Sequence, residues 1–264
     1  MRWCRFELRG VPCFGRVDGD RIVRIEGTPF ENPRDTTESI ALASATLLPP
    51  TIPNTFFSAG VNYRHHILEA QAKGSTMAKF PTRPETGYRA NNGLLGHDGT
   101  IVKPKDYEGR FEAEPELVAV IGRKIRRASK DECRAAILGW TIGNDVSARA
   151  WQYADRTLWR GKNCDTFKPM GPWIETAVDP MKSRTLVRLN GPQVAEFATG
   201  EMIFDPFDYM VEITKYITMS PGDVLWMGSD GNVGIAPGDV IEIEITGVGT
   251  LRNRVVLETR AKDL

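Results

Sequence analysis

The sequence lacks the features that would place the chain in a membrane or on nucleic acid. It has no uninterrupted apolar run of about 18 residues, the length from which a membrane-spanning helix is recognised. Its 34 basic residues are balanced by 34 acidic ones, and no acidic tail is present. A balanced charge gives no basic surface for nucleic acid. These absences predict a soluble globular protein whose partners include neither a membrane nor nucleic acid.

Cysteine is scarce, and its spacing indicates no pairing. Cys4, Cys13, Cys133 and Cys164 form no Cys-x-x-Cys motif, and no signal peptide is visible ahead of them. Such cysteines are typical of free thiols in a reducing compartment. We therefore expect a cytoplasmic location.

The sequence also lacks the glycine motifs of nucleotide-binding proteins. Its glycine-rich segment, residues 228–234, has neither a Walker lysine nor the GxGxxG spacing. We interpret the segment as a turn between strands. Contact with a substrate is the alternative.

Proline and glycine are frequent, by contrast, and they separate many short apolar runs. The 17 prolines and 25 glycines favour strands joined by turns. Residues 48–53 contain three prolines and form a stiff extended connection. We predict a strand-rich α+β fold with a small N-terminal β domain, residues 1–50, and a main domain, residues 51–264.

Local signals predict three short helices and one irregular segment. Residues 62–70 form the first helix, and the capping box that begins at Ser129 starts a second, which reaches about residue 138. Asp205 and Pro206 start a third, which ends before residue 220. Residues 74–93 have no clear period, which is typical of functional or mobile segments. Whether residues 64–93 form a lid stays open.

Three carboxylates stand at the ends of apolar runs. Glu114 and Glu116 are two apart, so one strand would point both to the same side. Taken alone, they also fit a solvated strand face, and Asp145 fits a turn cap. Pro115 marks a strand start or an edge, where a site can open. Carboxylates brought together need a cation, and hard divalent cations prefer oxygen ligands. Our hypothesis is one metal site.

A histidine and a lysine add candidate chemistry. His66 and Glu69 are three apart and share a helix face, which fits either a surface pair or a dyad that takes a proton from water. His65 points about 100° away on an ideal helix, and His97 belongs to a turn. Lys162 is either a surface lysine or a cation aimed at an oxyanion.

These motifs, in this order, resemble the fumarylacetoacetate hydrolase family. The resemblance covers roughly residues 55–257, and such an ordered series is highly specific. The first 50 residues match loosely. The motifs are Gly60-Val61-Asn62-Tyr63-x-x-His66-x-x-Glu69, Glu114-x-Glu116-Leu117-Val118-Ala119-Val120-Ile121-Gly122, Asn144-Asp145-Val146-Ser147-Ala148-Arg149-x-x-Gln152, Arg160-Gly161-Lys162, Asp165-Thr166-Phe167, Gly171-Pro172-Trp173, Thr199-x-x-Met202-Ile203-Phe204, Pro221-Gly222-Asp223-Val224 and Gly247-Val248-Gly249-Thr250-Leu251-x-Asn253.

The resemblance implies a fold, a metal and a set of roles. The fold is a mixed β-sheet roll with short peripheral helices, usually as a homodimer. The metal is Mg²⁺, with Mn²⁺ or Ca²⁺ as alternatives, held by Glu114, Glu116 and Asp145. The implied catalytic residues are His66, Glu69 and Lys162, and the implied substrate-binding residues are Arg149, Gln152 and Ser229.

The implied substrate is a small-molecule 2-oxo acid. Hydrolytic cleavage of a carbon–carbon bond in an acylpyruvate-type 2,4-dioxo acid is the leading expectation. Isomerisation or tautomerisation of a 2-hydroxydienoic diacid, decarboxylation of a 2-oxo diacid, and a non-catalytic binding role are the alternatives. Two departures concern substrate contacts: Gly228-Ser229-Asp230 replaces Gly-Thr-Pro, and Arg89 replaces a lysine.

Overall fold

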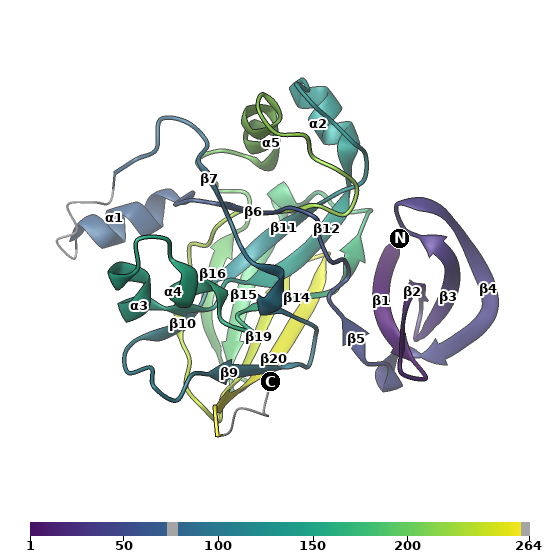
Figure 1. Cartoon of the computed structure of the whole chain (residues 1–264), viewed down its shortest axis with the longest axis horizontal. Coiled ribbons are helices and arrows are strands. Elements are labelled where there is room, and N and C mark those ends of the chain that lie inside the picture. Colours follow the sequence, from purple (N-terminus) through teal and green to yellow (C-terminus); the bar gives the residue numbers. More distant parts are fainter. Residues whose placement is uncertain (73–78, 260–264) are drawn as a thin grey trace.

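The computed structural model describes residues 1–72 and 79–259, without the side chains of Glu69 and Ala70. Strands dominate it, and they form three sheets with short helices around them (Figure 1). Both parallel and antiparallel pairs occur within the sheets. The predicted strand-rich α+β fold with mixed sheets is therefore confirmed.

The largest sheet has twelve strands and carries most of the candidate site. Its strands are β1 (Arg2–Leu8), β2 (Val11–Asp18), β3 (Arg21–Thr28), β4 (Glu31–Ala41), β5 (Leu47–Leu48), β6 (Phe56–Ala59), β7 (Thr86–Tyr88), β8 (Leu94–Leu95), β11 (Pro115–Ile121), β12 (Ile137–Asn144), β14 (Lys168–Glu175) and β17 (Val224–Trp226). They run in the order β4-β3-β2-β1-β14-β12-β11-β17-β6-β7, with β5 beside β1 and β8 beside β14.

The first four strands form an antiparallel meander at one side of the molecule (Figure 1). The meander is not separate from the rest, because β1 pairs with β14. At this junction the carboxylate of Glu175 accepts two hydrogen bonds, one from the amino group of Met1 at 3.2 Å and one from Nε of Arg2 at 2.9 Å. One sheet thus runs through both halves, and the division near residue 50 stays a prediction.

The two smaller sheets complete the second half of the chain. Their strands are β9 (Thr100–Lys103), β10 (Phe111–Ala113), β13 (Ser147–Ala148), β15 (Arg184–Leu189), β16 (Gln193–Ala198), β18 (Val233–Gly234), β19 (Val240–Ile245) and β20 (Gly249–Leu257). Five strands run in the order β16-β15-β19-β20-β9, and three in the order β13-β10-β18. The main apolar core contains side chains from β11 and β12 together with β19 and β20. Ile241, Ile243 and Ile245 are buried in it, as the alternation in β19 indicates.

The predicted helix signals are mostly confirmed. The helices are α1 (Arg64–Ala72), α2 (Lys130–Ala136), α3 (Arg149–Ala154), α4 (Trp159–Asn163) and α5 (Pro206–Thr214), with 3₁₀ turns η1 (Leu42–Ser44), η2 (Asn91–Gly93) and η3 (Pro180–Lys182). Ser129 and Asp205 begin α2 and α5 with capping boxes. The two helices pack together at one end of the sheet (Figure 1). The expected end of α2 near residue 138 is wrong, because Ile137 turns into the extended backbone of β12.

Membrane-spanning helices are not found in the part of the chain that the structure describes. The longest helices there, α1 and α5, have nine residues each, and none is long and apolar enough to cross a bilayer.

Close packing of the Trp226 side chain against Gly143 fixes β11 and β12, the two strands that lead into the candidate site. Gly143 of β12 is the register partner of Glu116 in β11. The fully buried indole of Trp226 covers Gly143 so closely that an added Cβ would lie 2.5 Å from the ring. A glycine at this position therefore lets the indole pack against β12 beside the candidate carboxylates.

We predict that Gly143→Ala lowers the free energy of unfolding by about 1–3 kcal/mol, because the new methyl group collides with a ring that has no space to retreat. Urea unfolding at fixed pH measures the change. Gly234→Ala is the matched control, since a Cβ at Gly234 meets nothing within 4 Å. Equal stability of the two variants would contradict the prediction.

Candidate metal centre

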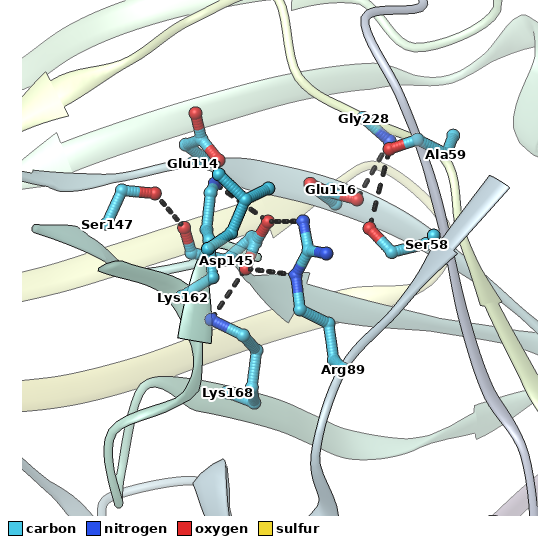
Figure 2. A network of polar contacts seen from close by, with 12 residues as sticks. Ser58, Ala59, Arg89, Glu114, Glu116, Asp145, Ser147, Lys162, Lys168 and Gly228 are labelled. Atoms are coloured by element: carbon cyan, nitrogen blue, oxygen red, sulfur yellow. Dashed lines mark hydrogen bonds and ion pairs between the residues drawn. The ribbon is translucent and has the colours of Figure 1, made fainter. Parts of the chain in front are cut away.

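Three buried carboxylates meet where the large sheet adjoins the three-stranded sheet. Glu114 is 8% exposed, Glu116 3% and Asp145 1%, and oxygen atoms from the three lie within 4.8 Å of one another. Figure 2 shows them converging between strands. A solvated strand face, the alternative interpretation of the two glutamates, is therefore wrong.

The glutamates do not lie on one continuous strand as expected. β10 ends at Ala113 and belongs to the three-stranded sheet, whereas β11 begins at Pro115 in the large sheet. Glu114 stands at the switch between them. Its N–H donates to Oδ1 of Asn144 at 3.0 Å, and its carbonyl oxygen accepts from the N–H of Asp145 at 2.9 Å. These two bonds bring the glutamate segment to the aspartate.

Three cations surround the carboxylate of Asp145. Its Oδ2 accepts from Nη2 of Arg89 at 2.8 Å and from Nζ of Lys162 at 2.9 Å. Its Oδ1 lies 2.6 Å from Nζ of Lys168. Burial alone would raise the pKa of Asp145, but the three cations hold it well below its usual value.

Glu114 is held by a second group of charges. Its carboxylate contacts Nζ of Lys162 and Nη2 of Arg149. Burial opposes ionisation, yet these two cations lower the pKa of Glu114 to about 2. The remaining guanidinium nitrogens of Arg149 donate to Glu112 at 2.6 Å and to Oε1 of Gln152 at 2.8 Å. Arg149 and Gln152 thus brace Glu114 in this structure, and their substrate contacts stay a prediction.

Glu116 differs from its two neighbours. Its Oε2 accepts from the N–H of Gly228 at 2.8 Å, and within the described residues no ion pair reaches it. Burial, followed by the negative charges of Asp145 and Glu114, raises the pKa of Glu116 to about 8. A cation at this place would favour the ionised form and release a proton near neutral pH.

The cluster suits a hard divalent cation. All three groups offer carboxylate oxygen, the donor that Mg²⁺, Mn²⁺ and Ca²⁺ prefer. The ammonium of Lys162 already bridges Glu114 and Asp145, so the space between these two carboxylates accommodates positive charge. Glu116 lies at this cluster as a buried acid whose ionisation is unfavourable without added positive charge. The residues therefore fit the metal that the sequence resemblance implies.

His66, the histidine predicted to be catalytic, lies on α1 and contacts Asp230. The backbone N–H of His66 donates to the carboxylate of Asp230, and Nδ1 of His65 lies 3.4 Å from Oδ1 of the same group. Asp230, where the family resemblance leads us to expect a proline, thereby ties α1 to the glycine-rich loop. The side chain of Glu69 lies outside the described residues, so the dyad with His66 stays a prediction.

The glycine-rich loop contacts both the carboxylate cluster and an open cleft. The N–H of Gly228 donates to Glu116, and Asp230 lines the cleft. Ser229 is half-buried, and its Oγ accepts from the N–H of Gly231 at 3.3 Å. A cleft of about 460 Å³ lies between α1 and this loop. The cleft is lined by Arg64, His65, Leu68, Glu201, Met202, Ile203 and Asp230. A substrate contact for Ser229 stays a prediction.

Sequence reasoning missed two charged residues of the centre. Glu112 and Lys168 were not identified, although Lys168 directly follows the motif that ends at Phe167. Spacing gave no signal for either residue, because Arg149, which contacts Glu112, and Asp145, which contacts Lys168, lie far from them in the sequence. Arg89, considered only as a departure among the substrate contacts, pairs with Asp145.

Comparison with known proteins identifies the family. Residues 55–256 match the family described as fumarylacetoacetate hydrolase, C-terminal, and residues 1–50 match the Rv2993c-like N-terminal family. The chain belongs to the fumarylacetoacetate hydrolase family, and it is an enzyme of that family.

Three proteins that are similar over nearly the whole chain have names of different kinds, and two of these names state an activity. Protein Rv2993c of Mycobacterium tuberculosis is 36% identical, covering 97% of this chain and 98% of the relative. The 2,4-didehydro-3-deoxy-L-rhamnonate hydrolase of Sphingomonas sp. (strain SKA58) is 31% identical, covering 97% and 96%. The crystal structure of 5-carboxymethyl-2-hydroxymuconate delta-isomerase from Mycobacterium smegmatis has a TM-score of 0.88 and 32% identity, covering 98% and 100%.

Glu116 should give the metal-free protein a pH-dependent stability. Its pKa is raised in the folded state, so its contribution is fully present below the pKa of about 4.5 in the unfolded chain and is lost as pH rises through about 8. We predict that, from about pH 5 to about pH 8, the unfolding free energy of the wild type falls relative to that of Glu116→Gln, by up to about 1.4 kcal/mol per pH unit.

Urea unfolding in EDTA across this pH range checks the prediction. Glu26→Gln, which changes an exposed glutamate, is the control and should follow the wild type. Parallel pH profiles for the wild type and Glu116→Gln would show that Glu116 titrates normally.

Proposed function

We propose that this protein is a divalent-metal-dependent hydrolase that cleaves a carbon–carbon bond in an acylpyruvate-type 2,4-dioxo acid. The observation that supports this proposal most directly is the cluster of Glu114, Glu116 and Asp145. These carboxylates are buried among cations, and all the ligand atoms they offer are oxygens. The hydrolase from Sphingomonas, which is similar over nearly the whole chain, supports hydrolysis. We further propose, from the family resemblance, a homodimer located in the cytoplasm.

In this proposal the three carboxylates hold the metal, with Mg²⁺ as the expected ion and Mn²⁺ or Ca²⁺ as alternatives. A bound divalent metal supplies Lewis-acid stabilisation of negative charge on substrate oxygens. The protein supplies a dry, rigid floor, since Asn144 ties Glu114 to the end of β12 and Gly228 orients Glu116.

The charges of the centre favour an anionic substrate. Four buried carboxylates face four largely buried cations in the described residues, so these charges balance when all are ionised, and a divalent cation adds two positive charges. Arg110, whose side chain is 72% exposed, also pairs with Glu112 from the surface. An acid that enters this centre restores the balance and gains from the low dielectric of a buried site. The carboxylates are Glu112, Glu114, Glu116 and Asp145, and the cations are Arg89, Arg149, Lys162 and Lys168.

Lys162 has the central role toward the substrate. Its ammonium bridges Glu114 and Asp145 in this structure. A metal held by these carboxylates would supply the positive charge that Lys162 now supplies. The role of the ammonium in this proposal is to bind a substrate carboxylate or the oxyanion that develops during the reaction.

His66 is proposed as the base, oriented by Glu69. It takes a proton from water, which attacks the carbonyl two carbons beyond the 2-oxo group. The carbon–carbon bond then breaks, and one product is the acid released from that carbonyl. The electron pair of the broken bond forms the enolate of pyruvate, which takes up the proton. Lys162 stabilises the negative charge during this step.

Isomerisation is the second candidate, and the resemblance to the Mycobacterium smegmatis isomerase favours it. A base at the position of His66 can move a proton along a dienol acid as well as activate water. The fold and the carboxylates serve both reactions, so the products decide between them.

We predict that Asp145→Asn and EDTA treatment each lower turnover by about a hundredfold or more, because both remove the means of stabilising developing negative charge. Added Mg²⁺ should restore the EDTA-treated wild type and leave Asp145→Asn inactive. Asp20→Asn, an exposed aspartate in a hairpin turn, is the control. Full activity in EDTA would refute the proposal.

Product analysis distinguishes the candidate reactions. An acylpyruvate, a 2-hydroxydienoate and oxaloacetate are each incubated with the Mg²⁺-loaded enzyme, and products are identified by NMR. We expect free carboxylic acid and pyruvate from the acylpyruvate. A shifted double bond with no cleavage would replace the hydrolase by the isomerase, and release of CO₂ would indicate a decarboxylase.

A further inference from the structure

Lys168 is a cation built into the wall of the carboxylate cluster. It is the first residue of β14 and is fully buried. Its Nζ contacts three oxygen atoms, Oδ1 of Asp145 at 2.6 Å and the carbonyl oxygens of Phe167 at 2.9 Å and Val146 at 3.2 Å. The ammonium donates hydrogen bonds to the two carbonyl oxygens and forms an ion pair with Asp145.

The path of the Lys168 side chain is also defined. It passes Gly93 in η2, where an added Cβ would lie 3.0 Å from Cγ of Lys168 and 3.2 Å from the carbonyl oxygen of Cys164. A glycine at this position leaves room for the lysine stem. The ammonium is therefore held in place by its acceptors and by the channel through which the stem runs.

Lys168 and Lys162 occupy different sides of Asp145. Lys162 contacts Oδ2 of Asp145 and also Glu114, which places it between two of the proposed metal ligands. Lys168 contacts Oδ1 and approaches Asp145 from the side away from Glu114 in the view of Figure 2. A metal between Glu114 and Asp145 would take the place of Lys162, whereas Lys168 can keep all its contacts.

From this geometry we propose that Lys168 is a permanent counter-ion of Asp145 and limits the affinity of the site for its metal. Its ammonium lies against Oδ1, whereas Oδ2 accepts from Arg89 and Lys162. The positive charge of Lys168 also repels a divalent cation bound at that carboxylate. Lys168 is thus a positioning residue that keeps the ion exchangeable. This inference rests on the proposed metal-dependent function.

Mn²⁺ binding to the metal-free protein, measured by electron paramagnetic resonance titration, tests the inference without using activity. Lys168→Met removes the charge beside Asp145, so the dissociation constant for Mn²⁺ should fall by roughly tenfold or more. Lys168→Gln keeps a hydrogen-bond donor without the charge and should shift affinity in the same direction. Lys182→Met, which changes a lysine with an 86% exposed side chain, is the control and should bind like the wild type.

The outcomes separate this inference from the proposed function. A wild type that does not bind Mn²⁺ overturns both. A wild type that binds, with unchanged or weaker binding in the folded Lys168 variants, overturns the role of Lys168 alone. A residue needed only for packing would weaken metal binding when changed, so tighter binding is specific to the proposed role. Should Lys168→Met fail to fold, Lys168→Gln gives the result.

Discussion

The site depends on the mutual compensation of buried charges. Carboxylates taken out of water lose their hydration, and Coulomb attraction must replace it if they are to stay ionised. Asp145 and Glu114 obtain this attraction from Arg89, Lys162, Lys168 and Arg149. Glu116 has no such partner in the described residues, and its pKa is raised accordingly. The uneven distribution of positive charge marks where further cationic charge would be most stabilising.

The architecture explains how charged residues far apart in sequence come together. Glu114 lies at the switch between two sheets, Asp145 directly follows β12, and Lys162 comes from α4. Gly143 and Trp226 hold the neighbouring strands close enough that the carboxylates meet. Buried strands and short tight turns, rather than long loops, therefore place most of the charged groups.

Features of the fold that depend on residues close together in the sequence could be predicted. The helix starts at Ser129 and Asp205 depend on neighbouring residues, and both helices begin there. The carboxylates Glu114, Glu116 and Asp145 were identified from ordered motifs. Lys168 could not be identified in this way, because its role depends on Asp145, which follows β12, and on the space beside Gly93. Likewise, the break at Glu114 reflects a change of sheet that strand periodicity does not encode.

The pairing of β1 with β14 has a consequence for the catalytic half of the chain. Trp3 packs with Met170 and Ile174 of β14, and β1 covers the end of that strand opposite Lys168. Without the N-terminal meander, β14 would present unpaired backbone groups and an apolar surface at a free sheet edge. Such edges invite pairing with other chains. The first fifty residues thus cover a sheet edge that would otherwise be open to pairing with another chain, even though every carboxylate of the site lies outside them.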